Sequence, residues 1–96
     1  MIYGIYVTKE NYDVYANGIK RRTSIAMGWY RDACYDSMKY AKKILDNAKD
    51  SLNDECYEIT KVNSVTFKGV RYTHYETKGF TPVKLEERIV YHIERR

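Results

Sequence analysis

The opening segment of the chain alternates apolar and polar side chains at the spacing typical of extended strands. Residues 2–8 place apolar groups on both faces of such a strand, which predicts a central position in a sheet. The polar residues 9–11 are expected to turn the chain. A second short run, residues 12–16, then leads into Asn17-Gly18, which predicts a tight hairpin with a two-residue loop.

The pairing expected for this hairpin places Asp13 opposite Arg22 and Val14 opposite Arg21. Because neighbouring side chains point to opposite faces of a strand, Val14 is then expected to face the core. Lys20 and Arg22 are expected to face solvent on the other side.

Helical spacing replaces the strand pattern after the hairpin. A short helical turn is expected at residues 26–27, and a longer helix is predicted from Asp36 or Ser37 to about Lys49. The apolar residues of the longer helix recur every three or four positions, and they are Met38, Ala41, Leu45, Ala48 and Leu52.

Three more extended segments are predicted after the helix. Residues 56–62 form the first, and residues 65–77 form either one long strand or a hairpin that turns at Lys68-Gly69. Residues 89–93 form the last. The expected order β-β-β-α-β-β-β indicates an α+β class, with an antiparallel sheet of about five to six strands and one principal helix. The 96 residues are expected to make a single domain, 1–96.

Composition adds a functional indication to this fold. The chain has 11 tyrosines against two phenylalanines and one tryptophan, and 17 lysines and arginines give it a net charge of +4. A tyrosine suits a half-buried surface that contacts a partner, because it offers an apolar ring and a hydroxyl. The five glycines are scattered and form no phosphate-binding loop, so no cofactor is expected.

Two groups of cationic and aromatic residues are the candidate binding sites. The first follows the hairpin and consists of Lys20, Arg21, Arg22, Trp29, Tyr30 and Arg31. The second lies in residues 65–77 and consists of Lys68, Arg71, Tyr72, His74 and Tyr75. On one extended strand Lys68 and Tyr72 share a face, with Arg71 opposite. Such groups can neutralise phosphates and stack bases. In the alternative, they are ordinary cross-strand contacts and side chains that cover the sheet.

The reactive side chains give little support to an enzyme. Structural zinc sites bring their ligands in close pairs, whereas the cysteines and histidines here are isolated: Cys34, Cys56, His74 and His92. Both cysteines are expected to be buried, reduced thiols of a cytoplasmic protein. Glu76-Thr77-Lys78 has the acid-x-lysine spacing of metal-dependent nucleases, but no partner aspartate strand accompanies it. With no long apolar run and no secretory signal, contact with a membrane is not expected.

The residues from the hairpin to the strand after the helix resemble small proteins encoded in bacteriophage genomes. The residues that carry this likeness are Thr23-Ser24, Ala33, Tyr35-Asp36-Ser37, 41–45 and 57–62, within residues 1–62. The resemblance implies a viral accessory protein, a class that includes inhibitors of bacterial defence systems. It assigns no site residue.

The expected function is therefore a non-catalytic inhibitor that binds a host or bacterial-defence protein, within the host cytoplasm, through a basic, tyrosine-rich surface. One form of this hypothesis expects the target to be a nucleic-acid-binding protein. The alternative is a nucleic-acid- or nucleotide-binding module, acting as a transcription regulator or by nucleotide sequestration. A small metal-dependent nuclease is the third interpretation.

Overall fold

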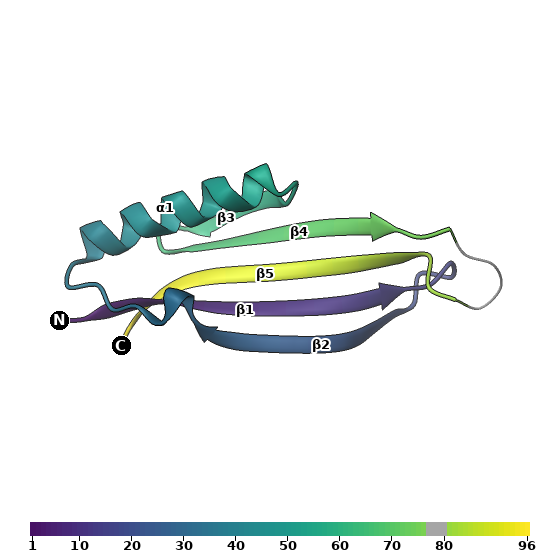
Figure 1. Ribbon diagram of the computed structural model, residues 1–96, viewed down its shortest axis with the longest axis horizontal. Helices are drawn as coiled ribbons and strands as arrows, with labels where there is room; N and C mark the ends of the chain where they lie inside the picture. Colours follow the sequence, from purple (N-terminus) through teal and green to yellow (C-terminus); the bar gives the residue numbers. More distant parts are fainter. Residues whose placement is uncertain (77–80) are drawn as a thin grey trace.

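The computed structural model describes residues 1–76 and 81–96, and it contains a five-stranded antiparallel sheet with one long helix (Figure 1). The strand order in the sheet is β2-β1-β5-β4-β3. The elements in chain order are β1 (Tyr3–Val14), β2 (Lys20–Trp29), the 3-10 turn η1 (Tyr30–Asp32), α1 (Met38–Asp54), β3 (Glu58–Asn63), β4 (Thr66–His74) and β5 (Lys84–Arg95). This architecture confirms the predicted α+β class.

Two strands, and not the predicted three, precede the helix. Residues 9–11 do not turn the chain, because they lie inside β1 and pair with both neighbouring strands. Residues 26–27 are not helical either, and lie inside β2. Pairing on both sides of β1 keeps this polar segment extended and overrides its local turn preference. After the helix, β4 is one continuous strand with no turn at Lys68-Gly69.

The hairpin between β1 and β2 differs from the prediction by one residue. The Tyr15 amide donates to the Ile19 carbonyl over 2.9 Å, and Gly18 has φ 84° at the end of a three-residue loop. A three-residue loop of this kind needs a residue in the left-handed region, which glycine adopts without strain. Val14 therefore lies opposite Lys20, and the expected pairing of Val14 with Arg21 is wrong.

This shift places the hairpin cations on a different face of the sheet. Tyr12 lies opposite Arg22, so Lys20 and Arg22 share the face of Tyr12 and Val14. An irregularity at Asn11/Tyr12 then shifts the pairing by one residue. The rest of β2 therefore pairs with β1 in the register that the sequence predicts.

Helix α1 begins where the sequence indicates and continues past the predicted end near Lys49. The Ser37 hydroxyl accepts a 3.1 Å hydrogen bond from the Tyr40 amide and caps the helix. Its apolar face buries Ala41, Leu45, Ala48 and Leu52. These side chains pack on sheet residues that include Ile5, Phe67, Ile89, Tyr91 and Ile93.

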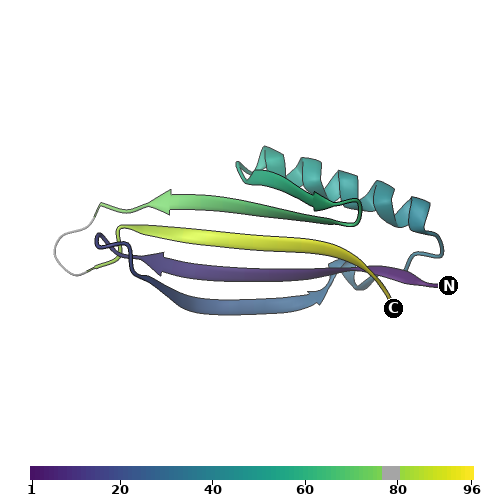
Figure 2. The same cartoon turned by 180° about the vertical axis from the view of Figure 1, so that it is seen from behind.

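The helix covers only one end of one face of the sheet. Figure 1 shows α1 over the end near both termini, while the strands continue beyond it toward the β1–β2 hairpin. The molecule is accordingly long and narrow, with extents of 53 × 21 × 20 Å. Seen from behind, the described strands have no helix in front of them (Figure 2). One whole face of the sheet is therefore left open.

Candidate binding surface

The open face is the side of the sheet opposite α1, and cross-strand pairing defines its residues. Residues that lie opposite each other on neighbouring strands share a face. We define a row as one β1 residue together with its partners on β2 and β5 and the β4 residue that pairs with the β5 partner. The rows that result contain Tyr6, Tyr12, Ile25, Met27, Trp29, Lys68, Val70, Tyr72, Arg88 and Val90.

Aromatic side chains form the row nearest the termini. Trp29 and Tyr6 meet edge to face, with ring centroids 5.2 Å apart and planes at 81°. The Arg96 guanidinium lies over the Trp29 ring, 4.9 Å from its centroid. These contacts hold the tryptophan ring in a fixed position at the edge of the open face.

Aliphatic side chains occupy the middle of the open face. Met27 is 62% exposed, Ile25 is 45% exposed and Val90 is 36% exposed. Lys68 lies opposite Val90 in the same row as Met27. A hollow of about 310 Å³ lies beside this row, lined by Glu10, Lys68, Gly69, Val70, Tyr72, Arg88, Ile89 and Val90.

A network of charged side chains occupies the third part of the open face, nearest the hairpin. Glu86 is only 1% exposed, and its carboxylate accepts from Lys20 Nζ at 2.8 Å and from Arg88 Nε at 2.6 Å. The Tyr72 hydroxyl also hydrogen-bonds Glu86. Burial raises the pKa of Glu86, but these three hydrogen bonds outweigh it and leave the pKa below its ordinary value. Glu86 is therefore charged at neutral pH.

A second carboxylate extends the network toward β2. Glu10 accepts from the Tyr12 hydroxyl at 2.6 Å and from the Arg22 guanidinium at 3.3 Å. The hydrogen bond from Tyr12 is the main cause that lowers the pKa of Glu10. Arg88 lies over the Tyr12 ring at 5.2 Å. Three cations of the open face, on Lys20, Arg22 and Arg88, thus form ion pairs with two carboxylates within the protein.

The first predicted group of site residues is divided between the two ends of β2. Lys20 and Arg22 lie at its start, and Trp29 lies at its end. A ten-residue strand is about 30 Å long, so these side chains do not form one neighbourhood. The predicted juxtaposition required residues 26–27 to bend the chain, and they are extended.

The other members of that group do not join the open face. Arg21 lies opposite Asp13, on the other side of the sheet from Arg22. Tyr30 packs against the core residue Tyr91, with centroids 5.4 Å apart, and Arg31 lies over the Tyr30 ring.

The second predicted group is divided between the two faces of β4, as its alternation indicates. Lys68 and Tyr72 lie on the open face, and Lys84 Nζ lies 4.4 Å from the centre of the Tyr72 ring. Arg71 lies on the helix side, where it forms a 2.7 Å ion pair with Glu87. Tyr75 is exposed just after the end of β4.

Several residues of the open face were missed by the sequence analysis. Tyr6 and Tyr12 of β1 and Arg88 and Val90 of β5 are central to it. The available signal was the two-residue alternation along β1 and β5. It was obscured because residues 9–11 were interpreted as a turn, which separated Tyr6 from Tyr12.

The isolated reactive side chains do not come together. Cys34 and Cys56 are both exposed, so the prediction of buried thiols is wrong. Cys34 follows η1 and Cys56 follows α1, and loop positions such as these lie at the surface. In residues 1–76 and 81–96 no three histidine, cysteine or acidic side chains are grouped so as to hold a metal ion. The candidate Glu76-Thr77-Lys78 extends into residues 77–80, outside the described residues.

Two further findings bear on the class of the protein. No helix among the described residues is both long enough and apolar enough to cross a membrane. No protein-family model, curated protein or solved structure matches this chain. The likeness of residues 1–62 to small phage proteins therefore stays a prediction.

Proposed function

We propose that this protein is a non-catalytic binding protein that engages another protein through its open face. The observation that carries the proposal is the exposed aliphatic patch of Ile25, Met27 and Val90, which occupies two neighbouring rows between the row of Trp29 and the row of Tyr72. Aromatic residues and methionine are enriched at protein interfaces. Exposed apolar side chains on a rigid sheet can bind with little loss of conformational entropy.

The charge arrangement supports a protein partner over a nucleic acid. Sequence-independent binding to nucleic acid depends on cations that are free to neutralise phosphates. On the open face Lys20, Arg22 and Arg88 already pair with carboxylates. Lys68, by contrast, makes no ion pair within the described part of the chain. Lys68 lines the same hollow as Tyr72, and this is the feature that favours nucleic acid as the second candidate partner.

A binding protein of this size acts by covering a surface of its target. With the phage-type resemblance, this leads us to infer a protein that inhibits a host or bacterial-defence component. The partner surface that fits the open face is apolar at its centre and carries polar groups around it, because the open face has the same arrangement.

Two variants with equal changes in charge test the proposal. Met27 and Ile19 are equally exposed, at 62% and 60%, but only Met27 lies in the middle of the open face. Met27→Glu should abolish capture of the target from nuclease-treated bacterial lysate. Ile19→Glu, in the hairpin loop, should capture it as the unchanged protein does.

The same capture experiment separates the candidate partners. A protein target held by apolar contacts should remain bound when salt is raised. Loss of the captured material after nuclease treatment, or a steep fall of affinity with salt, would instead identify nucleic acid as the ligand. Undiminished capture by Met27→Glu would show that the open face is not the contact surface.

A further inference from the structure

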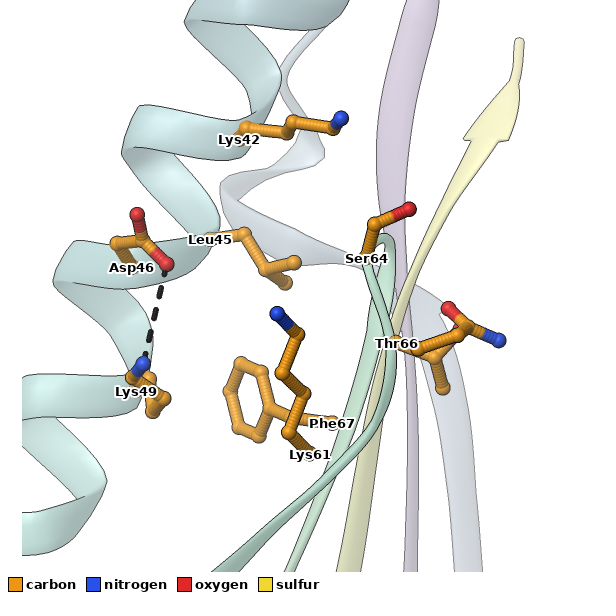
Figure 3. A pocket seen from close by; sticks show the side chains of 9 residues that line it. Lys42, Leu45, Asp46, Lys49, Lys61, Ser64, Thr66 and Phe67 are labelled. Atoms are coloured by element: carbon orange, nitrogen blue, oxygen red, sulfur yellow. Dashed lines mark ion pairs between the residues drawn. The ribbon is translucent and has the colours of Figure 1, made fainter.

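A cleft separates α1 from the turn between β3 and β4, away from the open face. It has a volume of about 260 Å³ and is lined by Lys42, Leu45, Asp46, Lys49, Lys61, Asn63, Ser64, Thr66 and Phe67. Figure 3 shows that Lys42 extends from the helix toward Ser64, while Lys61 extends from β3 toward the helix. The two side chains line the cleft from different walls, with Leu45 between their ammonium groups in this view.

The cleft carries an excess of positive charge. Its third cation, Lys49, lies 3.9 Å from Asp46, which is the one carboxylate among the lining residues (Figure 3). Neither Lys42 nor Lys61 makes an ion pair within residues 1–76 and 81–96. Three lysines and one aspartate leave two positive charges without a partner. Two unpaired ammonium groups can balance one doubly charged anion.

The inner wall of the cleft is apolar. Leu45 and Phe67 are 5% and 3% exposed, and both belong to the hydrophobic core beneath the lysines. Lys42 and Lys61 are themselves exposed, so an anion reaches them from solvent, and the apolar wall reduces the screening by water on one side only. Ser64, in the tight turn after β3, adds a hydroxyl that can donate to an anionic oxygen.

We propose that this cleft binds a small phosphate monoester, with the phosphate between Lys42 and Lys61. A phosphate presents several oxygens to donors that come from different directions, and lysine is a common partner for it. The volume lies slightly below the ~300–1,000 Å³ of pockets for drug-sized ligands, which limits the ligand to roughly the size of a nucleoside monophosphate. The non-phosphate part contacts the apolar wall.

This proposal is independent of the function assigned to the open face. Lys61 and Phe67 are paired residues on the helix side of the sheet, and the remaining lysines come from α1 itself. Loss of phosphate binding by the cleft would leave capture of a protein by the open face unchanged. Loss of protein capture would likewise leave phosphate binding unchanged.

Titration followed by backbone amide NMR tests the cleft, with inorganic phosphate and adenosine 5′-monophosphate as separate probes at matched ionic strength. We expect saturable shifts confined to residues 42–49 and 61–67. Tighter binding of the nucleotide would assign a role to the apolar wall, and equal binding would assign the affinity to the phosphate alone. Both outcomes support a phosphate site. The absence of saturable shifts with either probe would overturn it.

Two double variants separate a built site from general attraction to a basic protein. Lys42→Gln with Lys61→Gln should weaken binding at least tenfold. Lys39→Gln with Lys43→Gln removes the same charge from exposed positions of α1 that do not line the cleft, and should leave the affinity within twofold. Equal weakening by the two double variants would show that net charge alone attracts the anion, and would overturn the proposal.

Discussion

Glu86 and Glu87 are neighbours on β5, yet their carboxylates are buried on opposite faces of the sheet. Glu86 is 1% exposed and is held by Lys20 and Arg88 on the open face. Glu87 is 8% exposed and accepts from the Tyr57 hydroxyl at 2.8 Å on the helix side. Arg71 also donates to Glu87, at 2.7 Å. Glu86 thus connects β5 to β2 on the open face. Glu87 connects β5 to β4 and to the segment after α1 on the helix side.

We expect the protein to lose stability in acid because of this pair. Burial raises the pKa of each carboxyl, but the hydrogen bonds outweigh it, so both pKa values lie below the ordinary 4.5. A carboxyl whose pKa is lowered by folding stabilises the protein above its unfolded pKa, and this contribution disappears as the pH falls through the folded pKa. The free energy of unfolding in urea should therefore decline below about pH 4.5. A value that stays constant from pH 7 to pH 3 would contradict this.

Glu86→Gln tests the same carboxylate at neutral pH. The change keeps the side-chain volume but leaves Lys20 and Arg88 without a counter-ion on the open face. Hydrogen bonds to charged groups contribute about 1.5–3 kcal/mol to stability. We therefore expect the free energy of unfolding at pH 7 to fall by an amount within this range. The variant should also show a weaker dependence of stability on acid. Asp46→Asn is the control, because Asp46 is exposed and its contact with Lys49 is long at 3.9 Å.

The helix can be tested at the centre of its apolar face. Leu45 is 5% exposed and belongs to the core, so Leu45→Asp removes an apolar core side chain and buries a carboxylate in its place. This costs several kcal/mol against a total stability of about 5–10 kcal/mol. We expect circular dichroism to show no cooperative thermal transition for this variant. Leu45→Met, which conserves volume, should retain the transition. An unchanged midpoint for Leu45→Asp would show that the helix does not pack on the sheet as described.

Local signals in the sequence were sufficient for the helix and for the faces of β4. A serine cap followed by apolar residues at helical spacing located α1, because both signals act within a few residues of each other. Alternation along β4 correctly separated Lys68 and Tyr72 from Arg71. These features depend on short-range geometry, which a sequence records directly.

Long-range pairing determined the features that the sequence did not reveal. Residues 9–11 are polar and looked like a turn, but β2 and β5 pair with them on both sides. Asn17-Gly18 was correctly placed in a hairpin, yet the same two residues fit loops of two or three residues. The difference of one residue moved Lys20 to the face of Val14, where it meets Glu86. That contact spans two strands and leaves no local pattern.

The end of α1 offers a stabilising substitution. Cys56 has φ 67°, a left-handed conformation that glycine adopts more readily than other residues. The Tyr57 amide donates to the Leu52 carbonyl and the Cys56 amide to the Asn53 carbonyl, which is the pattern of a Schellman motif. Cys56→Gly should therefore raise the free energy of unfolding in urea by about 0.5–1 kcal/mol. Cys34→Gly is the control, because Cys34 is also exposed but has no positive φ. This change should not raise the free energy of unfolding. Equal effects of the two changes would contradict this account of the helix end.

Gly4 of β1 and Gly28 of β2 provide a matched test of the position of Trp29. A Cβ on Gly4 would lie 2.7 Å from Cε3 and 2.9 Å from Cζ3 of the Trp29 ring, whereas a Cβ on Gly28 would meet nothing within 4 Å. Gly4→Ala must therefore displace the ring from its edge-to-face contact with Tyr6, and overpacking of this kind costs about 1–3 kcal/mol. Gly28→Ala should be neutral or stabilising by up to about 1 kcal/mol, because alanine loses less conformational freedom in a strand.

The protein contains a single tryptophan, so its fluorescence reports on this ring alone. We expect Gly4→Ala to change the emission of the folded protein and to lower its unfolding midpoint in urea, and Gly28→Ala to do neither. Because Trp29 ends the aromatic row of the open face, a displaced ring should also weaken capture of the target by Gly4→Ala. Native emission and an unchanged midpoint for Gly4→Ala would mean that the ring does not lie against Gly4.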